Sequence, residues 1–168
     1  LCEPLAPSLL SVPKGSTVAP LGSDNGMRFR RGRLIHRLLE LLPELPEEKR
    51  MTCAMKILSN PSHGLSKPAK QEIADVTLSV LSDPIFAAVF GPGSRAEVAI
   101  VGSDGKRTVS GQIDRLMVLD DHILIVDYKS DRLAPELISD VPDAYLAQLA
   151  QYFRLIQRIY PTHIIQCG

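Results

Sequence analysis

Apolar residues recur at helical spacing in the stretch of the chain that follows Met27. The repeat consists of Leu34, Ile35, Leu38, Leu39 and Leu42. Residues three and four apart share one face of an α-helix, so the repeat predicts an amphipathic helix. Pro43 and Pro46 follow at once and predict its end, because proline cannot continue a helix interior.

Two further helices are predicted at residues 47–58 and 66–81, where the same spacing returns. Ser66 is placed to cap the second of them. Its expected apolar stripe consists of Ile73, Val76, Val80 and Leu81. Asp83-Pro84 then opens a short helical turn, which Gly91-Pro92-Gly93 ends.

The pattern changes to one typical of strands in the second half of the chain. Residues 95–101, 108–119 and 122–127 are rich in Val, Ile and Leu. The breaks between them are Gly102-Ser103-Asp104-Gly105 and Asp120-Asp121. Connections this short join antiparallel neighbours, so the three segments predict a meander.

Helical spacing returns in residues 141–160. Its apolar positions are Tyr145, Leu146, Leu149, Tyr152, Phe153, Ile156 and Ile159. Residues 162–166 then predict the start of one more strand. Helices, a meander, a long helix and a final strand predict an α/β (α+β) fold, with a mixed sheet flanked by helices.

Residues 1–26 lack this periodicity and contain Pro4, Pro7, Pro13 and Pro20 among Ser, Gly and Thr. They are predicted to form a linker. Residues 27–168 are predicted to form one domain, since 168 residues with 45% hydrophobic content suffice for one core. The chain opens on Leu1 without a Met and stops at Gly168, just after the start of the last predicted strand, so we expect it to be excised from a larger protein.

The formal net charge is zero, with 19 basic and 19 acidic residues. Any attraction to nucleic acid must therefore come from local charge. Five arginines without an intervening acid fall within ten residues: Arg28, Arg30, Arg31, Arg33 and Arg37. They could track DNA phosphates, with Arg33 as a candidate contact, or simply form a solvated helix face.

The three cysteines, Cys2, Cys53 and Cys167, lie far apart. Their spacing favours neither a zinc site, nor an iron–sulfur cluster, nor a disulfide framework. No apolar run approaches the roughly 18 residues that cross a bilayer, and the first residues do not follow a signal-peptide pattern. We therefore expect a cytoplasmic protein with no membrane partner.

The strongest chemical signal lies at the end of the predicted strand 122–127, where Asp127-Tyr128-Lys129 follows an apolar run. Side chains alternate along a strand, so Asp127 and Lys129 are expected on one face. Such a carboxylate can hold a cation while the lysine orients or polarises a water. This combination suits metal-assisted phosphodiester hydrolysis.

Asp114 is an acid within the apolar part of the preceding strand. A carboxylate near a core is costly unless something pairs with it. A divalent cation shared with Asp127 would satisfy it, and Mg²⁺ prefers oxygen ligands. The alternatives are that Asp114 only pairs with Arg115 or Arg132, and that Asp127 and Lys129 form a surface ion pair.

His36 lies at the edge of the first helix's apolar stripe, and Gly32, one turn earlier, leaves space beside its imidazole. A lone helical histidine is more often a packing or surface residue than a ligand, so His36 is a candidate only together with the acids. Glu97 is either a further acid of the site or an edge-strand charge.

Gln148 and Tyr152 are four residues apart and are expected to be neighbours on the long helix. They could contact substrate phosphates or buttress the lysine. The plainer interpretation is that Tyr152 belongs to the core and Gln148 to the solvated surface.

Together, these motifs resemble those of RecB-type nuclease domains of the PD-(D/E)XK superfamily, over roughly residues 27–166. The matching motifs, in family order, are Gly32-x-x-x-His36, Glu97, Gly111-x-Ile113-Asp114-Arg115, Asp127-Tyr128-Lys129 and Gln148-x-x-x-Tyr152. The resemblance is greatest to the nuclease domain of AddA-type helicase–nuclease subunits, where sequence segments like residues 125–132 of this chain are typical.

The resemblance implies a restriction-endonuclease-like core in which His36, Asp114 and Asp127, with the Tyr128 backbone carbonyl, hold Mg²⁺ or Mn²⁺. It implies that Lys129 assists the attacking water. It also implies an exonuclease acting on DNA, single-stranded at the site, in double-strand-break repair, tethered to a helicase region and beside an AddB-like subunit. The alternatives are a catalytically silent nuclease fold that binds DNA or braces a partner, and an unrelated interaction domain.

Overall fold

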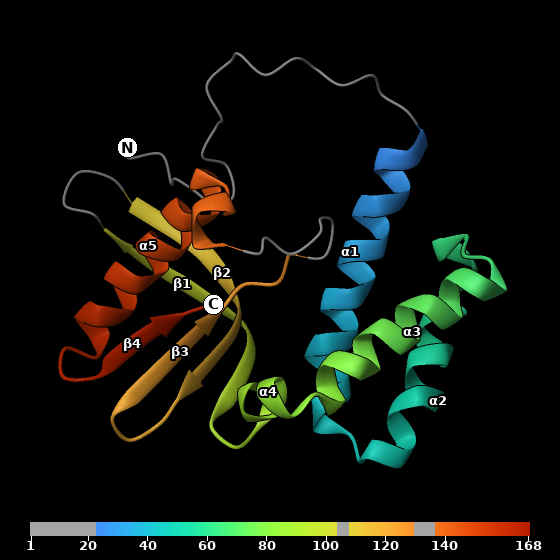
Figure 1. Ribbon diagram of the computed structural model, residues 1–168, viewed down its shortest axis with the longest axis horizontal. Helices are drawn as coiled ribbons and strands as arrows, with labels where there is room; N and C mark the ends of the chain where they lie inside the picture. Colours follow the sequence, from blue (N-terminus) through green and yellow to red (C-terminus); the bar gives the residue numbers. More distant parts are fainter. Residues whose placement is uncertain (1–22, 104–107, 130–136) are drawn as a thin grey trace. The chain divides into compact units, whose positions relative to one another are not determined.

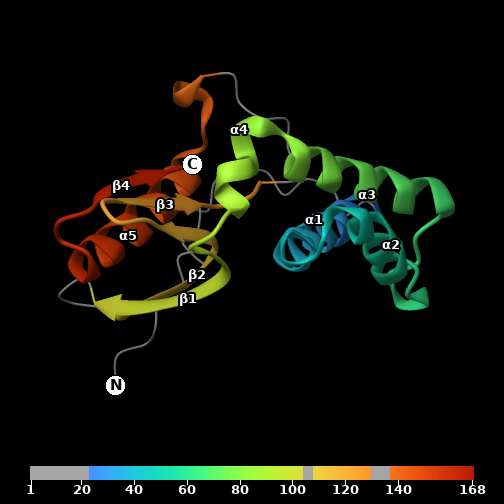
Figure 2. The same cartoon turned by 90° about the horizontal axis from the view of Figure 1, so that it is seen from below.

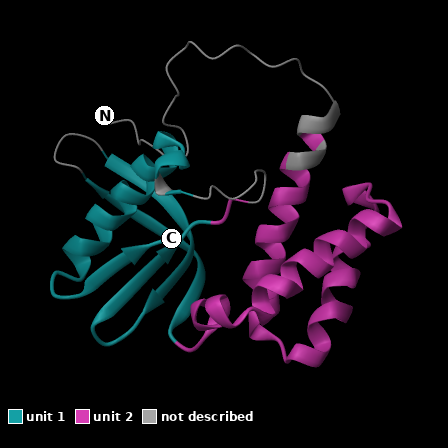
Figure 3. Cartoon of the chain, in the orientation of Figure 1, with its two compact units in different colours: residues 1–19, 93–127, 134–168 teal, residues 20–92, 128–133 magenta. Residues whose placement is uncertain are grey.

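The computed structural model describes residues 23–103, 108–129 and 137–168. Within these ranges the chain divides into two compact units (Figure 3). Unit 1 contains residues 93–103, 108–127 and 137–168, and unit 2 contains residues 23–92 and 128–129. Each unit has its own hydrophobic core. Most of the predicted linker, residues 1–22, lies outside the described residues.

Unit 2 is helical and follows the predicted order of elements. It consists of α1 (Ser23–Leu41), the 3-10 turn η2 (Leu42–Glu44), α2 (Glu47–Leu58), η3 (Pro61–His63), α3 (Lys67–Ser82), α4 (Pro84–Ala87) and η4 (Ala88–Phe90). The three long helices are confirmed, although α1 begins four residues before Met27. Pro43 lies in the first turn of η2, where a missing N–H costs no helical hydrogen bond.

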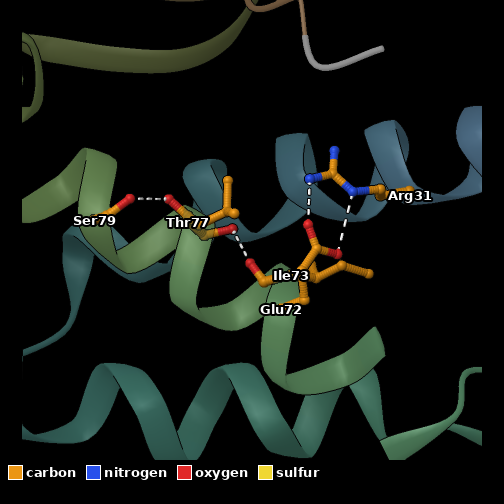
Figure 4. A network of polar contacts seen from close by, with 6 residues as sticks. Arg31, Glu72, Ile73, Thr77 and Ser79 are labelled. Atoms are coloured by element: carbon orange, nitrogen blue, oxygen red, sulfur yellow. Dashed lines mark hydrogen bonds and ion pairs between the residues drawn. The ribbon is translucent and has the colours of Figure 1, made fainter. Parts of the chain in front are cut away.

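The helices of unit 2 pack through a core rich in leucine. Its most deeply buried large side chains are Leu38, Leu42, Leu58 and Ile73. Arg31 of α1 also reaches α3, where its guanidinium lies 2.6 Å from the Glu72 carboxylate (Figure 4). Both charged side chains remain partly exposed, so the apolar core supplies most of the stabilisation.

The buried face of α3 differs from the predicted stripe. Val76 is 38% exposed, whereas Ala74 and Thr77 are fully buried. Thr77 tolerates burial because its hydroxyl donates to the Ile73 carbonyl at 2.8 Å (Figure 4). The prediction was wrong at Val76 because that residue lies on the flank of the face that α3 presents to its neighbours.

Side-chain caps mark the starts of α3 and α4. Ser66 caps α3 as predicted, with its hydroxyl oxygen accepting from the Ala69 N–H at 3.4 Å. Asp83 accepts from the Ile85 N–H at 2.8 Å and starts α4.

No single helix in the described ranges is long and apolar enough to cross a membrane. Helix α3 and residues 84–90 reach that length and apolarity only as a combined pair, and the pair is bent by 71°.

Unit 1 is built on a four-stranded mixed sheet with the order β1-β2-β3-β4 (Figures 1 and 2). β1 (Ser94–Ser103), β2 (Thr108–Val118) and β3 (His122–Val126) form an antiparallel meander, and β4 (Ile164–Cys167) pairs parallel to β3. A parallel neighbour requires a crossover, which the turn η5 (Ile138–Asp140) and helix α5 (Asp143–Ile159) help to form. The predicted α+β fold with a mixed sheet is confirmed.

Helix α5 packs against the sheet through a narrower face than predicted. Tyr152, Leu155 and Ile156 are buried in the core of unit 1. Leu146 and Ile159, both predicted to be apolar contacts, are 41% and 61% exposed. Leu155, outside the predicted stripe, is buried because it packs where β1 carries Gly102, a position at which any Cβ would collide with it.

Candidate functional site

Two acids face one another on neighbouring strands of unit 1. The antiparallel register aligns Ala96 with Arg115 and Val98 with Ile113, so Glu97 lies opposite Asp114. Ligand oxygens of the two carboxylates lie within 4.8 Å of one another, and both residues are half-buried. Like charges directly opposite destabilise a strand pair, so this position favours a bound cation.

Glu97 also has an unusual backbone conformation. Its φ of 52° is the only positive value for a non-glycine residue in the described part of the chain. Such a conformation costs about 1 to 3 kcal/mol and persists where the surroundings impose it, commonly at functional sites. The strain coincides with the acid pair, so it supports a functional role for this position.

A chain of hydrogen bonds connects Glu97 to helix α5. The Gln112 side-chain amide donates to the Glu97 carboxylate at 2.6 Å. The Tyr152 hydroxyl donates to the Gln112 backbone carbonyl at 2.9 Å, and the Gln148 amide donates to that hydroxyl at 3.0 Å. The helix therefore holds the strand segment that presents the acids.

These contacts also place the predicted pair on α5. Gln148 and Tyr152 are neighbours, as expected from their spacing. Tyr152 is 1% exposed, which agrees with its interpretation as a core residue, while Gln148 is half-buried. A contact of either residue with substrate or with the lysine stays a prediction.

Asp127 lies one residue beyond β3, and not within the strand as predicted. Its N–H donates to the Gly168 carbonyl at 3.0 Å, which extends the pairing with the last strand. The β2–β3 register, in which Arg115 pairs with Val126, brings Asp127 level with Asp114 when continued by one residue. The Asp127 carboxylate does not share the 4.8 Å spacing of the Glu97 and Asp114 carboxylates.

The strand argument for Lys129 is also wrong, because residues 127–129 have no strand conformation. Strand alternation therefore does not bring Lys129 and Asp127 onto one face. Lys129 is exposed and Tyr128 is half-buried. Both belong to unit 2, where Tyr128 packs against the helical core.

His36 is half-buried on α1, and Gly32 one turn earlier is buried. The imidazole meets the Tyr128 ring edge to face, with 5.5 Å between ring centroids. This contact restricts the orientation of the imidazole within unit 2. The acids belong to unit 1, so a ligand set that joins them to His36 stays a prediction.

The arginine run on α1 is partly engaged within unit 2. Arg31 pairs with Glu72, Arg37 lies 2.6 Å from Glu40, and Arg30 donates to the His63 carbonyl at 2.9 Å. Arg33 is exposed and stacks over the Phe29 ring at 5.3 Å. The Arg28 side chain lies outside the described part of the structure. Arg33 therefore stays a candidate for a contact with DNA.

Sequence reasoning missed Gln112 and the burial of Arg115. Gln112 precedes Asp114 by two residues and therefore shares its side of the strand, which was the available signal. Arg115 is 1% exposed and donates to the Ser94 hydroxyl at 3.2 Å. Arg132, the other suggested partner of Asp114, lies outside the described residues.

The chemistry of the facing acids fits a divalent cation. Both offer carboxylate oxygens, the donors that hard divalent ions such as Mg²⁺ and Mn²⁺ prefer. A cation between them would offset the repulsion that their register imposes. The fold and these donors are those expected of the class of metal-assisted hydrolases, with the facing acids as a candidate metal site on the sheet.

The comparison with protein families gives this class a name. The sequence model of the PD-(D/E)XK nuclease superfamily matches residues 12–163. The chain belongs to the PD-(D/E)XK nuclease superfamily, whose members are hydrolytic nucleases that use divalent metals. Among the curated proteins, none matches the chain.

Proposed function

We propose that this chain is a Mg²⁺-dependent exonuclease domain that hydrolyses phosphodiester bonds in DNA, one strand at a time. The observation that best supports the proposal is the pair of facing carboxylates, Glu97 and Asp114, in a chain of the nuclease superfamily. A cation resolves their repulsion, and the family's chemistry requires one.

The proposed ligands are His36, Asp114, Asp127 and the Tyr128 backbone carbonyl, with Glu97 as a further acid. When bound, Mg²⁺ or Mn²⁺ polarises the scissile phosphate and lowers the pKa of a coordinated water. Asp114 lies on the central strand of the meander, level with an acid on either side. Tyr128 supports His36 through the ring contact.

The remaining residues orient the reacting groups. Lys129 donates hydrogen bonds to the attacking water or to the scissile phosphate and holds them in line. Gln112 orients the Glu97 carboxylate through its 2.6 Å hydrogen bond. The Tyr152 hydroxyl in turn holds the Gln112 backbone by donating to its carbonyl. Arg33 is exposed and is proposed to contact the DNA backbone.

The likeness of residues 125–132 to AddA-type domains supports a more specific proposal. The nuclease domain, residues 27–168, follows a linker at 1–26 and is joined to a helicase region of the same polypeptide. It works in the cytoplasm beside an AddB-like subunit, on single-stranded DNA produced during double-strand-break repair. A catalytically silent nuclease fold is the alternative that cleavage assays must separate from this one.

The test is cleavage of 5′-labelled single-stranded DNA in Mg²⁺ or Mn²⁺. Asp114→Asn, Asp127→Ala and Lys129→Ala should each lose activity while circular dichroism shows an intact fold. Loss of several kcal/mol of transition-state stabilisation lowers the rate by about 10²- to 10³-fold. Asp120→Asn, an exposed acid in the β2–β3 turn, is the matched control and should cleave normally.

Two outcomes would contradict the proposal. Equal activity in the wild type and the three site variants would place the chemistry elsewhere. Metal binding measured by calorimetry without any cleavage would favour the catalytically silent module.

A further inference from the structure

A cavity of about 350 Å³ lies in unit 1 where helix α5 crosses the end of β1 and the start of β2. It is lined by Ser103, Val109, Gln151, Arg154, Leu155 and Arg158. Ser103 is six residues from Glu97 along β1, roughly 20 Å at 3.3 Å per residue. The cavity is therefore distinct from the acid pair.

Two arginines place positive charge along one side of this cavity. Arg154 and Arg158 are one helical turn apart, so they lie on the same face of α5, and both are exposed. Arg158 donates to the Ser103 carbonyl, and neither guanidinium pairs with an acid among the described residues. Like charges at this spacing destabilise a helix, so a bound anion would relieve their repulsion.

One residue that lines the cavity carries an unsatisfied acceptor. The Gln151 side-chain oxygen is buried and has no hydrogen-bond partner in the described parts of the chain. A buried carbonyl without a donor costs free energy. A rotation of the Gln151 side chain on ligand binding would bring this oxygen to a ligand N–H or O–H and recover that free energy. Val109 and Leu155 supply an apolar wall beside it.

We propose that this cavity binds a nucleotide. The two guanidinium groups take the phosphate, the apolar wall takes the sugar or base, and Gln151 accepts from a hydroxyl or amino group. The volume falls within the range of small-molecule sites, about 300 to 1,000 Å³. The choice of a deoxynucleotide rests on the proposed function, and the source is either a free nucleoside monophosphate or one nucleotide of a DNA strand.

The experiment uses the full chain in EDTA, so that no result depends on cleavage or on the metal site. Thymidine monophosphate and inorganic phosphate are titrated by calorimetry, and fluorescein-labelled dT12 by anisotropy at several salt concentrations. Arg154→Gln and Arg158→Gln are compared with Arg95→Gln, an exposed arginine on β1, as the matched control. Gln151→Leu tests the acceptor.

Each cavity arginine variant should weaken thymidine monophosphate binding by about tenfold, as expected for a lost charge-assisted hydrogen bond, while Arg95→Gln binds like the wild type. Gln151→Leu should weaken the nucleotide and leave inorganic phosphate unchanged. If the cavity also holds one nucleotide of a DNA strand, the slope of log K against log salt concentration for dT12 falls in magnitude by about 0.7 per arginine removed. An unchanged dT12 slope assigns the site to the free nucleotide.

Equal affinity for both thymidine monophosphate and dT12 in all the variants and the control would overturn the proposal. Loss of cleavage in a separate assay would leave this result unaffected, because binding is measured without metal.

Discussion

Replacing Glu97 by glutamine removes one charge from the facing pair and changes the shape of the side chain very little. Glutamine keeps an oxygen that can accept the hydrogen bond from Gln112. It also keeps the backbone strain at this position, so the substitution isolates the electrostatic contribution. We expect the metal-free protein to become more stable and its stabilisation by metal to become smaller.

The size of the effect follows from the separation of the carboxylates. At 4.8 Å, the upper limit of the spacing of their ligand oxygens, two unit charges repel by about 0.9 kcal/mol at the dielectric constant of water and by about 3.5 kcal/mol at an effective value near 20. Glu97 and Asp114 are both half-buried, so the expected gain in unfolding free energy lies between these limits, about 1 to 3 kcal/mol. Metal should narrow this difference, since a cation at 100 times its Kd stabilises the wild type by about 2.7 kcal/mol.

The assay is urea denaturation of the wild type and of Glu97→Gln, in EDTA and in excess Mg²⁺ or Mn²⁺. Asp120→Asn removes an exposed acid from the β2–β3 turn and controls for the change in net charge. The reasoning fails if Glu97→Gln is less stable than the wild type in EDTA. It also fails if both proteins gain equally from metal.

Two predictions concern the fold that supports the site. Gly93→Ala should destabilise the protein by at least about 1 to 2 kcal/mol, because φ is 86° and a Cβ would lie 2.8 Å from the Val118 carbonyl oxygen. Gly26→Ala, where a Cβ meets nothing within 4 Å in helix α1, should instead gain up to about 1 kcal/mol, and equal midpoints in urea would refute the argument. Tyr152→Phe removes the donor to the Gln112 carbonyl. It should lower the free energy of unfolding by about 1 to 2 kcal/mol and should also weaken metal binding. Unchanged urea stability and an unchanged calorimetric Kd for Mn²⁺ would show that the hydrogen bond does not support the acids.

The positions of most elements could be predicted because their signals are local. Proline after the leucine repeat placed the end of α1, and Ser66 marked the start of α3. The change of period near Arg95 separated helices from strands, and the short breaks indicated antiparallel neighbours. The matching motifs likewise led to the nuclease superfamily, which the family comparison shows.

The exact buried face of each helix was less predictable. Val76 and Leu146 belong to apolar repeats but remain exposed. A repeat spans more of the helix surface than one neighbour covers, so the packing partner selects the part that is buried. Leu155 shows the same effect in reverse, since it is buried where Gly102 allows the helix to approach the strand.

The sequence by itself determined the kinds of elements, their order and the candidate acids, because these depend on residues close together in the chain. Only the tertiary structure decided that Glu97 lies opposite Asp114, that Gln112 holds its carboxylate, and that Asp127 falls beyond its strand. These features depend on strand register and on the positive φ of Glu97. Both arise when segments that are distant in sequence pair with one another, which no local pattern records.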